Sequence, residues 1–377
     1  MDRMYDAVVV GAGPAGSAAA ARLAGFGAKV ALLEKDAFPR RKVCGQFLAG
    51  DGIDSLERLG AKDSVEGLGP ERIETGRIHV PGQAAVSFPL RAPGLGISRR
   101  VFDDLLARRA ETAGAEWTTG IRVLAVEGST DGGFRVRFSR GDSSDEIQAR
   151  VVVGAWGRWD ALDRSLSRRF LSLRGRFFGW NVELAGDSEF LRGEVRLYLF
   201  EGGYCGLSRL EGGRVNLAGV ISDRLRQGLP AGWDAVLAHA RHGNPELARD
   251  LASLQAERDG FLGTGPVFFT AKPPTERGML MAGDAAGVID PFSGEGQASA
   301  LASGILAGDT AARALAGEVP LPDLPRVYAR EWRRRFFRRF AWSALFRRIM
   351  LHREIGSAAA RLAGRPLVEL AMRNLGR

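Results

Sequence analysis

The opening segment of the chain places a stretch of small residues between two apolar runs. The first run, Tyr5–Val10, ends in glycines, and the second, Lys29–Leu33, ends at Glu34. Small residues from Ser17 to about Phe26 separate them. Short apolar runs of this kind are typical of buried parallel strands. The pattern therefore predicts a strand, a helix and a second strand that form one β–α–β unit.

The turn before the predicted helix has the spacing G-x-G-x-x-G, formed by Gly11, Gly13 and Gly16. In dinucleotide-binding folds the first glycine allows a tight turn, the second lets the backbone approach a pyrophosphate, and the third lets helix and strand pack closely. The helix N-terminus offers free N–H groups to the phosphates. Glu34 can accept hydrogen bonds from an adenosine ribose and would repel a 2′-phosphate, which argues against NADP at this site. The motif alone does not separate FAD from NAD.

A second strand-to-helix transition occurs late in the chain. The apolar run Met279–Ala282 predicts a strand, and an Ala-rich stretch that ends near Ala316 predicts a long helix. The positions between them that carry chemistry are Gly283, Asp284, Pro291, Gly294 and Gly296. The Asp284 carboxylate can accept hydrogen bonds from a flexible polyol, and N–H groups at a helix start stabilise negative charge by roughly 0.3–1 kcal/mol. A reduced flavin carries such a charge, so this element indicates a flavin.

Together these two regions resemble the FAD-dependent oxidoreductases built on the aromatic-ring hydroxylase fold. The resemblance is strongest to the geranylgeranyl reductase family, and the flavin-dependent halogenases are similar at a greater distance. Lys42–Gly45 is similar to the Cys-Gly motif of that family, and Arg99–Asp103 is similar to its Arg-x-x-Phe-Asp helix start. The resemblance covers most of residues 1–160 and 272–316, and it implies FAD as the cofactor.

The resemblance also implies roles for single residues. Glu34 is expected to bind the ribose, Arg99 the phosphate or ribose region of FAD, and Asp284 the ribityl chain. Pro291 and Gly294–Gly296 are expected to lie against the flavin ring. The full set expected to bind the cofactor is Gly11, Gly13, Gly16, Glu34, Lys35, Arg99, Gly283, Asp284, Pro291, Gly294 and Gly296. The sequence has no second dinucleotide fingerprint, so NAD(P)H is expected at most as a transient electron donor.

The segment after the apolar run Val151–Val153 departs from the family pattern. Trp156 and Asp160 stand where the family has the Asp and the Ser of Ala-Asp-Gly-x-x-Ser. In ring hydroxylases this Asp-Gly pair is linked to both FAD and NADPH, so its loss weakens the case for an NADPH-driven hydroxylase. The alternative interpretation is sequence drift at a structural turn.

Residues 202–219 predict a β-hairpin, because two β-like runs flank Glu211–Gly213. The hairpin lies where prenyl-lipid reductases carry Tyr-x-Trp-x-Phe-Pro and then Asn-Val-Gly. Tyr204 and Asn216 match, whereas the Trp and the Phe-Pro pair are replaced by Gly206, Ser208 and Arg209. The substrate is therefore expected to differ from an ordinary geranylgeranyl chain. The Trp-x-Trp-x-Ile-Pro motif of tryptophan-type halogenases is absent, which disfavours halogenation.

Two residues are candidates for a catalytic role, Cys44 and Tyr204. Cys44 follows Arg40–Lys42, and nearby cations favour a thiolate. One interpretation places Cys44 beside the flavin, where it guides the substrate or moves a proton; the other makes it a small residue packed against the cofactor. Cys205 is interpreted as a pocket or strand residue. The four His residues form no metal-ligand spacing, so no metal site is predicted.

The composition is that of a globular protein, and its charge is placed unevenly. The chain has 377 residues, of which 45% are hydrophobic, only two cysteines and a net charge of +9. The low cysteine count and the lack of a membrane-span pattern predict a cytoplasmic protein. Arg326–Arg353 contains ten Arg and one acid, Glu331, so the rest of the chain sums to zero. That distribution disfavours a general nucleic-acid-binding protein.

Aromatic residues recur at helical spacing in this basic segment, at Tyr328, Trp332, Phe336 and Phe340. One interpretation is a membrane-surface helix that brings the enzyme to a lipid-borne substrate. The favoured interpretation is a helix that packs on the body while its arginine stems cover apolar surface. An acidic carrier or a phosphorylated substrate would also use the positive charge.

The sequence as a whole predicts an α/β protein with a discontinuous Rossmann-type FAD-binding domain, a β-sheet-rich substrate domain and a basic helical C-terminal segment. The expected ranges are 1–75, 97–165 and 272–325 for the first, 76–96 and 166–271 for the second, and 326–377 for the third. The predicted function is redox chemistry on a small hydrophobic molecule, foremost reduction of an unsaturated polyketide-like or isoprenoid-like substrate. The alternatives are a flavin monooxygenase for an aromatic or polyketide substrate, a flavin-dependent halogenase, and a basic membrane- or nucleic-acid-binding flavoprotein with structural FAD.

Overall fold

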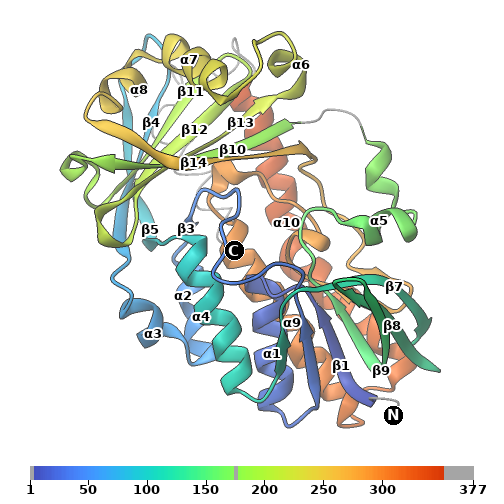
Figure 1. Ribbon diagram of the computed structural model, residues 1–377. Helices are drawn as coiled ribbons and strands as arrows, with labels where there is room; N and C mark the ends of the chain where they lie inside the picture. The colour runs from blue at the N-terminus through green and yellow to red at the C-terminus, as the bar shows by residue number, and fades with distance from the viewer. Residues whose placement is uncertain (1–3, 174–176, 352–377) are drawn as a thin grey trace.

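The computed structural model describes residues 4–173 and 177–351, and it places two sheets one above the other (Figure 1). The lower layer consists of the first sheet and the helices around it. The upper layer consists of the second sheet and the short helices on its outer face. The long C-terminal helix passes behind both layers.

The first sheet follows the order β15-β16-β9-β1-β2-β6 and is parallel except for its edge strand β15. Its central residues Val8–Val10 and Val151–Val153 are buried, as expected for strands covered on both faces. A hairpin of β7 and β8 pairs with β9. The strands are β1 (Met4–Val10), β2 (Val30–Leu33), β6 (Glu116–Thr118), β7 (Ile121–Ser129), β8 (Gly133–Arg140), β9 (Ser143–Gly154), β15 (Thr275–Glu276) and β16 (Met279–Met281).

The helices of the lower layer are α1 (Pro14–Gly25), α2 (Asp51–Leu59), α3 (Lys62–Glu66), α4 (Arg99–Thr112) and α9 (Gly296–Leu315). Two of them, α1 and α9, pack closely because their buried faces are rich in alanine and glycine. A Cβ at Gly304 of α9 would lie 2.1 Å from the carbonyl oxygen of Ala15 in α1, so only glycine permits this approach. Helix α1 begins at Pro14, earlier than the predicted start at Ser17, because proline suits the first turn, where N–H groups have no helical partner.

The second sheet has the order β14-β10-β13-β12-β11-β4-β5-β3. Its strands are β3 (Phe47–Leu48), β4 (Glu71–His79), β5 (Val86–Gly96), β10 (Phe177–Gly186), β11 (Glu194–Phe200), β12 (Gly203–Arg209), β13 (Val215–Ser222) and β14 (Leu254–Val267). The predicted hairpin is confirmed, since β12 and β13 pair antiparallel on either side of a short turn, η3 (Glu211–Gly213). The expected domain boundary between residues 75 and 76 falls inside β4.

The two faces of the second sheet have different surroundings. Tyr204, Gly206 and Ser208 of β12 line a cavity on the inner face. Cys205 and Leu207 point to the outer face, into a core with α7 (Trp233–Gly243) and α8 (Pro245–Asp250). The remaining short elements are α5 (Ala161–Ser165), α6 (Asp223–Arg226), η1 (Arg169–Ser172), η2 (Glu189–Leu191), η4 (Gly283–Ala285), η5 (Pro291–Ser293) and η6 (Leu321–Asp323).

The basic C-terminal segment forms α10 (Leu324–Leu351), whose apolar face packs on the lower layer. Tyr328, Trp332 and Phe336 are buried there, and the Tyr328 hydroxyl donates to the carbonyl oxygen of Met281 at 2.6 Å. Residues 352–377 of the predicted segment lie outside the described residues. Within the described part of the chain, no helix is both long enough and apolar enough to cross a membrane.

Candidate active site

A cavity of about 710 Å³ lies between the two layers, within the size range of cofactor and substrate sites. Its lower wall contains the glycine turn, the segment after β2 and the start of α9. Its upper wall is the inner face of the second sheet, where apolar side chains such as Phe88, Leu197 and Val220 predominate. The cavity therefore joins a polar wall to an apolar one.

The three glycines of the turn differ in what surrounds them. Gly11 has a φ of 101°, and a Cβ there would lie 2.5 Å from the carbonyl oxygen of Ala155. A Cβ at Gly16 would lie 1.8 Å from the carbonyl oxygen of Gly11. At Gly13 the nearest protein atom would be 3.8 Å away. Gly11 and Gly16 are thus required by the fold, whereas Gly13 leaves its backbone open to the cavity.

Two guanidinium groups stand over this open backbone. Nη2 of Arg99 and Nη2 of Arg40 would lie 3.8 and 3.9 Å from a Cβ at Gly13. Arg99 is fixed by two hydrogen bonds to Asp103, at 2.6 and 2.7 Å, and Arg40 by Glu34 at 3.2 Å. Burial by itself would lower the pKa of Arg99. The neighbouring Asp103 and Cys44 together have the larger effect, so the pKa of Arg99 is raised. Arg40 was not among the predicted cofactor ligands; its signal in the sequence is a basic residue shortly after the strand-ending Glu34.

Glu34 and Lys35 lie at the end of β2, on the cavity wall. Oε2 of Glu34 accepts a hydrogen bond from the Ala12 amide at 2.8 Å, and Oε1 accepts one from the Asp36 amide at 2.9 Å. Lys35 forms an ion pair with Asp160 at 2.5 Å. The Glu34 carboxylate therefore ties the glycine turn to the second strand, at the place where an adenosine ribose lies in dinucleotide folds.

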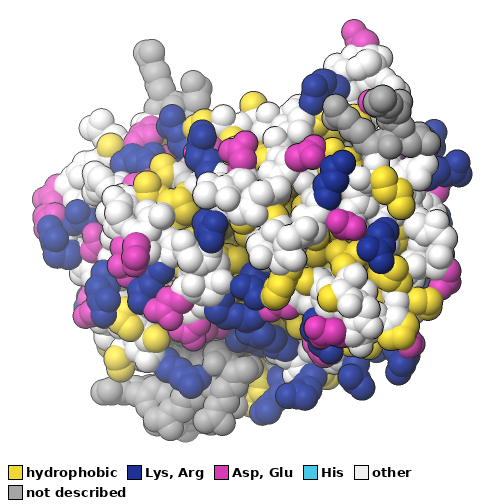
Figure 2. Space-filling view, turned by 90° about the horizontal axis from the view of Figure 1, so that it is seen from below, with side chains coloured by type: hydrophobic (Ala, Val, Ile, Leu, Met, Phe, Trp, Pro, Cys, Tyr) yellow, Lys and Arg dark blue, Asp and Glu magenta, His cyan; other side chains and the backbone are white. Residues whose placement is uncertain are grey.

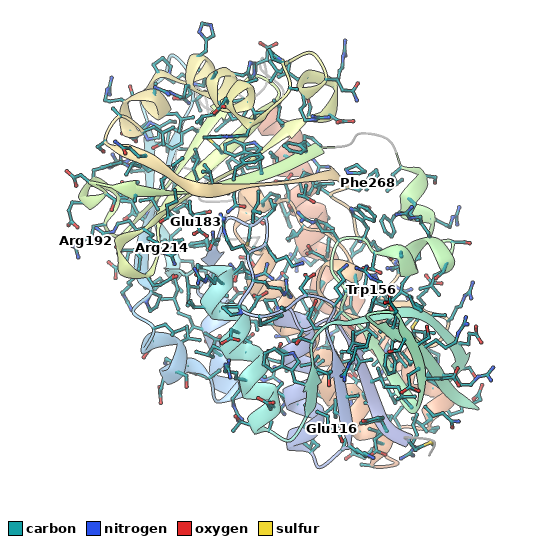
Figure 3. All side chains as sticks on the ribbon, in the orientation of Figure 1. Glu116, Trp156, Glu183, Arg192, Arg214 and Phe268 are labelled. Carbon is teal, nitrogen blue, oxygen red and sulfur yellow. The ribbon has the colours of Figure 1, made fainter. Side chains whose placement is uncertain are left out.

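Trp156, which departs from the family pattern, is part of a local network at the end of β9. In Figure 3 it lies on the side of the first sheet that faces the second. Its Nε1 donates to Asp163 at 3.1 Å, and the same carboxylate accepts from the Asp160 amide at 2.6 Å, so the two acids cap α5 reciprocally. Asp163 also pairs with the buried Arg168 at 3.0 Å. Trp156 and Asp160 thus serve a structured turn that also lines the cavity.

The late glycine-rich element forms the floor of the cavity, with Gly283, Asp284, Pro291, Gly294 and Gly296 all on its lining. Within residues 4–173 and 177–351, no group donates a hydrogen bond to the Asp284 carboxylate. The Lys272 ammonium donates instead to the backbone carbonyl oxygen of Asp284, at 2.8 Å. Burial lowers the pKa of Lys272 to about 8. Gly294 has a φ of 69°, and a Cβ at Gly296 would meet no atom within 4 Å. The Asp284 carboxylate and the start of α9 are therefore accessible to a ligand.

Cys44 lies at the border between the two walls. Its Sγ accepts from the Gln46 amide at 3.3 Å and from Nε2 of Gln297 at 3.7 Å. The cations that precede it in sequence point to carboxylates instead, Arg40 to Glu34, Arg41 to Glu183 and Lys42 to Asp36. The cation in contact with the thiol is Arg99, which comes from another element.

A buried polar network across both layers holds the Cys44 loop. Asn216 of β13 donates to the carbonyl oxygen of Cys44 at 3.2 Å and accepts from Gln46 at 2.9 Å. Gln46, which has a φ of 53°, also bonds Glu183 at 3.2 Å and accepts from the Arg99 amide at 3.0 Å. Figure 3 shows Glu183 beside Arg214 at the lower edge of the second sheet, and their side chains are 3.0 Å apart. The sequence did not identify Gln46, Glu183 and Gln297 as site residues. The only signal for Gln46 and Gln297 is that each directly follows a motif, the Cys-Gly motif and the late glycine-rich element respectively.

Tyr204 lines the cavity away from this network. Its hydroxyl donates to Oδ1 of Asp290, and its ring meets Phe292 edge-on at a centroid distance of 5.1 Å. Burial and the neighbouring Asp290 raise the pKa of Tyr204 well above its ordinary value. Arg347 of α10 approaches the other carboxylate oxygen of Asp290 at 3.3 Å. The phenolic proton is thus already committed to a carboxylate.

The cavity fits FAD by its own chemistry. Its polar wall offers an open glycine backbone, two guanidinium groups for a pyrophosphate and, at Asp284, an acceptor for a polyol. Within the described residues, Nε of Arg40 and Oε1 of Gln297 are buried and have no hydrogen-bond partner. Groups of this kind are expected where a ligand completes the site. Metal-binding clusters of three or more His, Cys, Asp or Glu side chains are absent from the described residues.

Comparison with known proteins agrees with this geometry. Residues 4–182 match the sequence family described as the FAD binding domain. Together with the cavity, the match defines an FAD-dependent oxidoreductase.

The relatives narrow the class further. A digeranylgeranylglycerophospholipid reductase of Methanosarcina acetivorans is 27% identical over 88% of this chain and 81% of its own. A menaquinone reductase of Mycobacterium tuberculosis is 29% identical over 82% of this chain and 77% of its own. This chain is an FAD-dependent oxidoreductase, and it is similar to proteins of the geranylgeranyl reductase family, in agreement with the resemblance that its motifs predicted.

Solved structures support the fold. A geranylgeranyl bacteriochlorophyll reductase-like protein of Thermoplasma acidophilum is 21% identical, with a TM-score of 0.78, over 98% of this chain and 99% of that one. A flavin-dependent brominase, Bmp2, is 22% identical, with a TM-score of 0.80, over 99% of this chain and 93% of that one. The predicted Rossmann-type α/β fold is confirmed, and these two likenesses concern the fold alone.

Proposed function

We propose that this protein uses FAD to reduce an unsaturated, isoprenoid-like molecule held in the cavity between the two layers. The observation that carries the proposal is the position of Cys44, between the polar wall suited to FAD and the apolar inner face of the second sheet. The two relatives are named for reduction of digeranylgeranylglycerophospholipid and of menaquinone, both of which carry isoprenoid chains. A polyketide-like substrate would suit the same apolar wall.

The chain's own residues would bind FAD along the lower wall. Arg40 and Arg99 would hold the pyrophosphate above Gly13, Glu34 would bind the ribose and Asp284 the ribityl chain. The flavin ring would lie against the segment from Pro291 to Gly296, with Lys35 at the opposite, adenosine end. When bound and reduced, FAD supplies the two electrons of the reaction. NAD(P)H is the proposed transient donor that reduces it.

Cys44 is the proposed proton donor, because its proton is the more available of the two catalytic candidates. The Tyr204 hydroxyl already donates to Asp290, so toward the cavity it offers only lone pairs. The Sγ–H of Cys44 would give its proton to a substrate carbon as the double bond is reduced. The thiolate left behind would be stabilised by the neighbouring Arg99 guanidinium. Tyr204 would contact and position the substrate elsewhere in the cavity.

The inner face of the second sheet would select the substrate. Gly206 and Ser208 are small, and the residue opposite Gly206 across the hairpin, Ala218, is small as well. The space they leave suits a ring or a branch better than a straight chain. This agrees with the loss of the Trp that prenyl-lipid reductases carry at the position of Gly206.

A lipid-borne substrate would require contact with a membrane, and α10 is the proposed contact. Its outer face exposes Phe337 and Leu345 to 62% and 49%, together with Arg333, Arg334 and Arg338. An exposed apolar stripe flanked by arginines suits an anionic membrane surface. An acidic carrier protein is the other partner that this charge would suit.

Substitution of Cys44 tests the proton-donor role. We expect C44A to lower turnover of a digeranylgeranylglycerophospholipid probe by roughly 100-fold or more, the size of a general-acid contribution. C44S is expected to recover part of this loss. The matched control is C205A, whose thiol is buried on the other face of β12, where burial raises its pKa. Full turnover in C44A with intact flavin content would overturn the proposed role.

A further inference from the structure

A second cavity, of about 290 Å³, lies far from the flavin site, at the C-terminal ends of α1, α2 and α4. Three arginines line it, one from each helix: Arg22, Arg58 and Arg109. The glycine turn is at the other end of α1, which at 12 residues is about 18 Å long. This second cavity, called the arginine pocket below, is therefore separate from the proposed substrate and cofactor site.

Neighbouring groups balance only part of the charge in the arginine pocket. Asp309 of α9 pairs with Nε of Arg22 at 2.6 Å and with Nη2 of Arg58 at 2.7 Å, so one carboxylate serves two cations. Arg109 donates from Nε to the carbonyl oxygen of Leu59 at 2.7 Å and forms no ion pair within residues 4–173 and 177–351. The bond from Arg109 to Leu59 caps the C-terminal end of α2. Arg22 also donates from Nη1 to the carbonyl oxygen of Arg58 at 3.3 Å, near the same end of α2. The side chains of Arg22, Arg58, Arg109 and Asp309 together still carry two more positive than negative charges.

The surface around the arginine pocket is both basic and apolar. Phe26 is 61% exposed, and the Arg22 guanidinium lies 5.1 Å from its ring centroid. Arg335 of α10 adds a fourth arginine near this group. Burial, and next the positive charge of the nearby Arg58, lower the pKa of Arg335. Figure 2 shows Lys and Arg side chains gathered on this underside of the molecule. Phe337, 62% exposed, projects from the same helix as Arg335.

We propose that the arginine pocket binds the phosphate of an anionic phospholipid while Phe26 and Phe337 enter the membrane interface. Guanidinium groups match phosphate oxygens in bidentate geometry, and a cavity of this size admits a headgroup. A site for a free phosphate would need the arginines alone. The exposed Phe26 ring, which lines the pocket, favours a phosphate that is attached to a lipid surface, and Phe337 supplies a second exposed ring on α10. The inference rests on the proposed membrane contact of α10 and adds a specific headgroup site outside it.

Co-sedimentation with vesicles tests the inference. The flavin-loaded protein is mixed with phosphatidylcholine vesicles that contain or lack phosphatidylglycerol. We expect salt-sensitive binding only to the anionic vesicles, and a loss of roughly tenfold or more in R58Q/R109Q, because each basic residue at a membrane surface contributes appreciably. The matched control R72Q/R192Q removes two exposed arginines that sit in surface ion pairs elsewhere, and it should bind as the unchanged protein does.

A second variant keeps the test decisive if R58Q/R109Q folds poorly. D309N retains all three arginines but removes the carboxylate that Arg22 and Arg58 share, so binding to anionic vesicles is expected to tighten. Equal losses in the pocket and control variants would overturn the inference. Thermal stabilisation by inorganic phosphate that is lost in R58Q/R109Q, with vesicle binding unchanged, would also overturn it and would indicate a soluble-phosphate site. Reduction of a detergent-dispersed substrate should be unaffected by R58Q/R109Q, so failure of the proposed reaction would show up separately.

Discussion

Glycine occurs in both layers of this protein, for opposite reasons. In the lower layer, a Cβ at Gly11 or Gly16 would lie 2.5 or 1.8 Å from a backbone oxygen, and neither neighbour can move without disturbing the sheet. In the upper layer, a Cβ at Gly206 would come within 3.1 Å of only the end of the Leu197 side chain. The first two glycines are required by the fold, whereas Gly206 leaves room in the cavity.

This difference shows how the two layers divide the work. The lower layer binds a cofactor whose shape does not vary, so its sequence is tightly constrained. In the proposed function the upper layer faces the substrate, so its inner-face residues can change size while the strands keep their register. The predictions that follow test this division, from the largest expected effect to the smallest.

The sharpest contrast is expected within the glycine turn. G16A should destabilise the protein by about 3 kcal/mol and abolish flavin binding, because the new Cβ overlaps a backbone oxygen. G13A should fold normally, since Gly13 has an ordinary extended φ of −73° and no near neighbour. Its FAD affinity should still fall by roughly tenfold, or about 1.4 kcal/mol. Thermal unfolding and flavin titration measure both effects, and equal behaviour of the two variants would contradict the contrast.

In the upper layer, enlarging Gly206 should affect the substrate and spare the cofactor. G206W fills the cavity from the inner face of β12, so kcat/KM should fall roughly tenfold or more while flavin content is unchanged. G206A adds only one methyl group and serves as the graded control, with a small expected effect. Loss of flavin in G206W would show that the two walls are not independent.

The Asn216 network links the layers, and its removal should have an intermediate effect. N216A leaves Gln46, Asn181 and the Cys44 carbonyl without a shared partner. Buried polar groups without partners cost about 1–3 kcal/mol each, so stability and turnover should both fall. Denaturant unfolding and steady-state kinetics measure both, and wild-type turnover in N216A would mean that the network does not position Cys44.

The smallest effect on the cofactor and substrate walls is expected from Glu295 at the start of α9, whose proton instead sets the pH dependence of stability. The pKa of Glu295 is raised to about 8 from an ordinary 4.5, first by burial and second by the negative charge of Asp51. Asp51 lies nearby because both carboxylates pair with Arg339. The folded protein therefore holds this proton between pH 4.5 and 8 where the unfolded chain has lost it, and stability falls as pH rises through that window. E295Q stays neutral, so its Tm should vary less over the same window. An equally steep fall in E295Q would contradict this assignment.

Sequence reasoning reached the parts of the site that one short segment encodes. The β–α–β unit, the glycine turn and the late Gly-Asp element follow from local spacing, because backbone geometry and phosphate chemistry act within a few residues. The partners of Cys44 could not be found in this way. Gln46 is only two residues from Cys44, but Arg99, Asn216 and Gln297 come from three separate elements, and only the fold brings them to the thiol loop.

Local sequence misled at points where tertiary contacts decide. The cations next to Cys44 seemed suited to its thiol, but each pairs with a carboxylate supplied by the surrounding chain. The substrate is the least predictable feature, because the inner face of the second sheet carries mostly apolar groups that many hydrophobic molecules would satisfy.

Anaerobic single turnover tests the central claim most directly. The flavin of the purified protein is reduced with dithionite, and excess reductant is removed. Menaquinone or digeranylgeranylglycerophospholipid, each in detergent and in a separate run, is then added without oxygen. The account predicts that flavin absorbance returns and that mass spectrometry shows the product gaining two hydrogens for each double bond reduced. Flavin that stays reduced until oxygen is admitted, with oxygen or halogen found in the product, would contradict it.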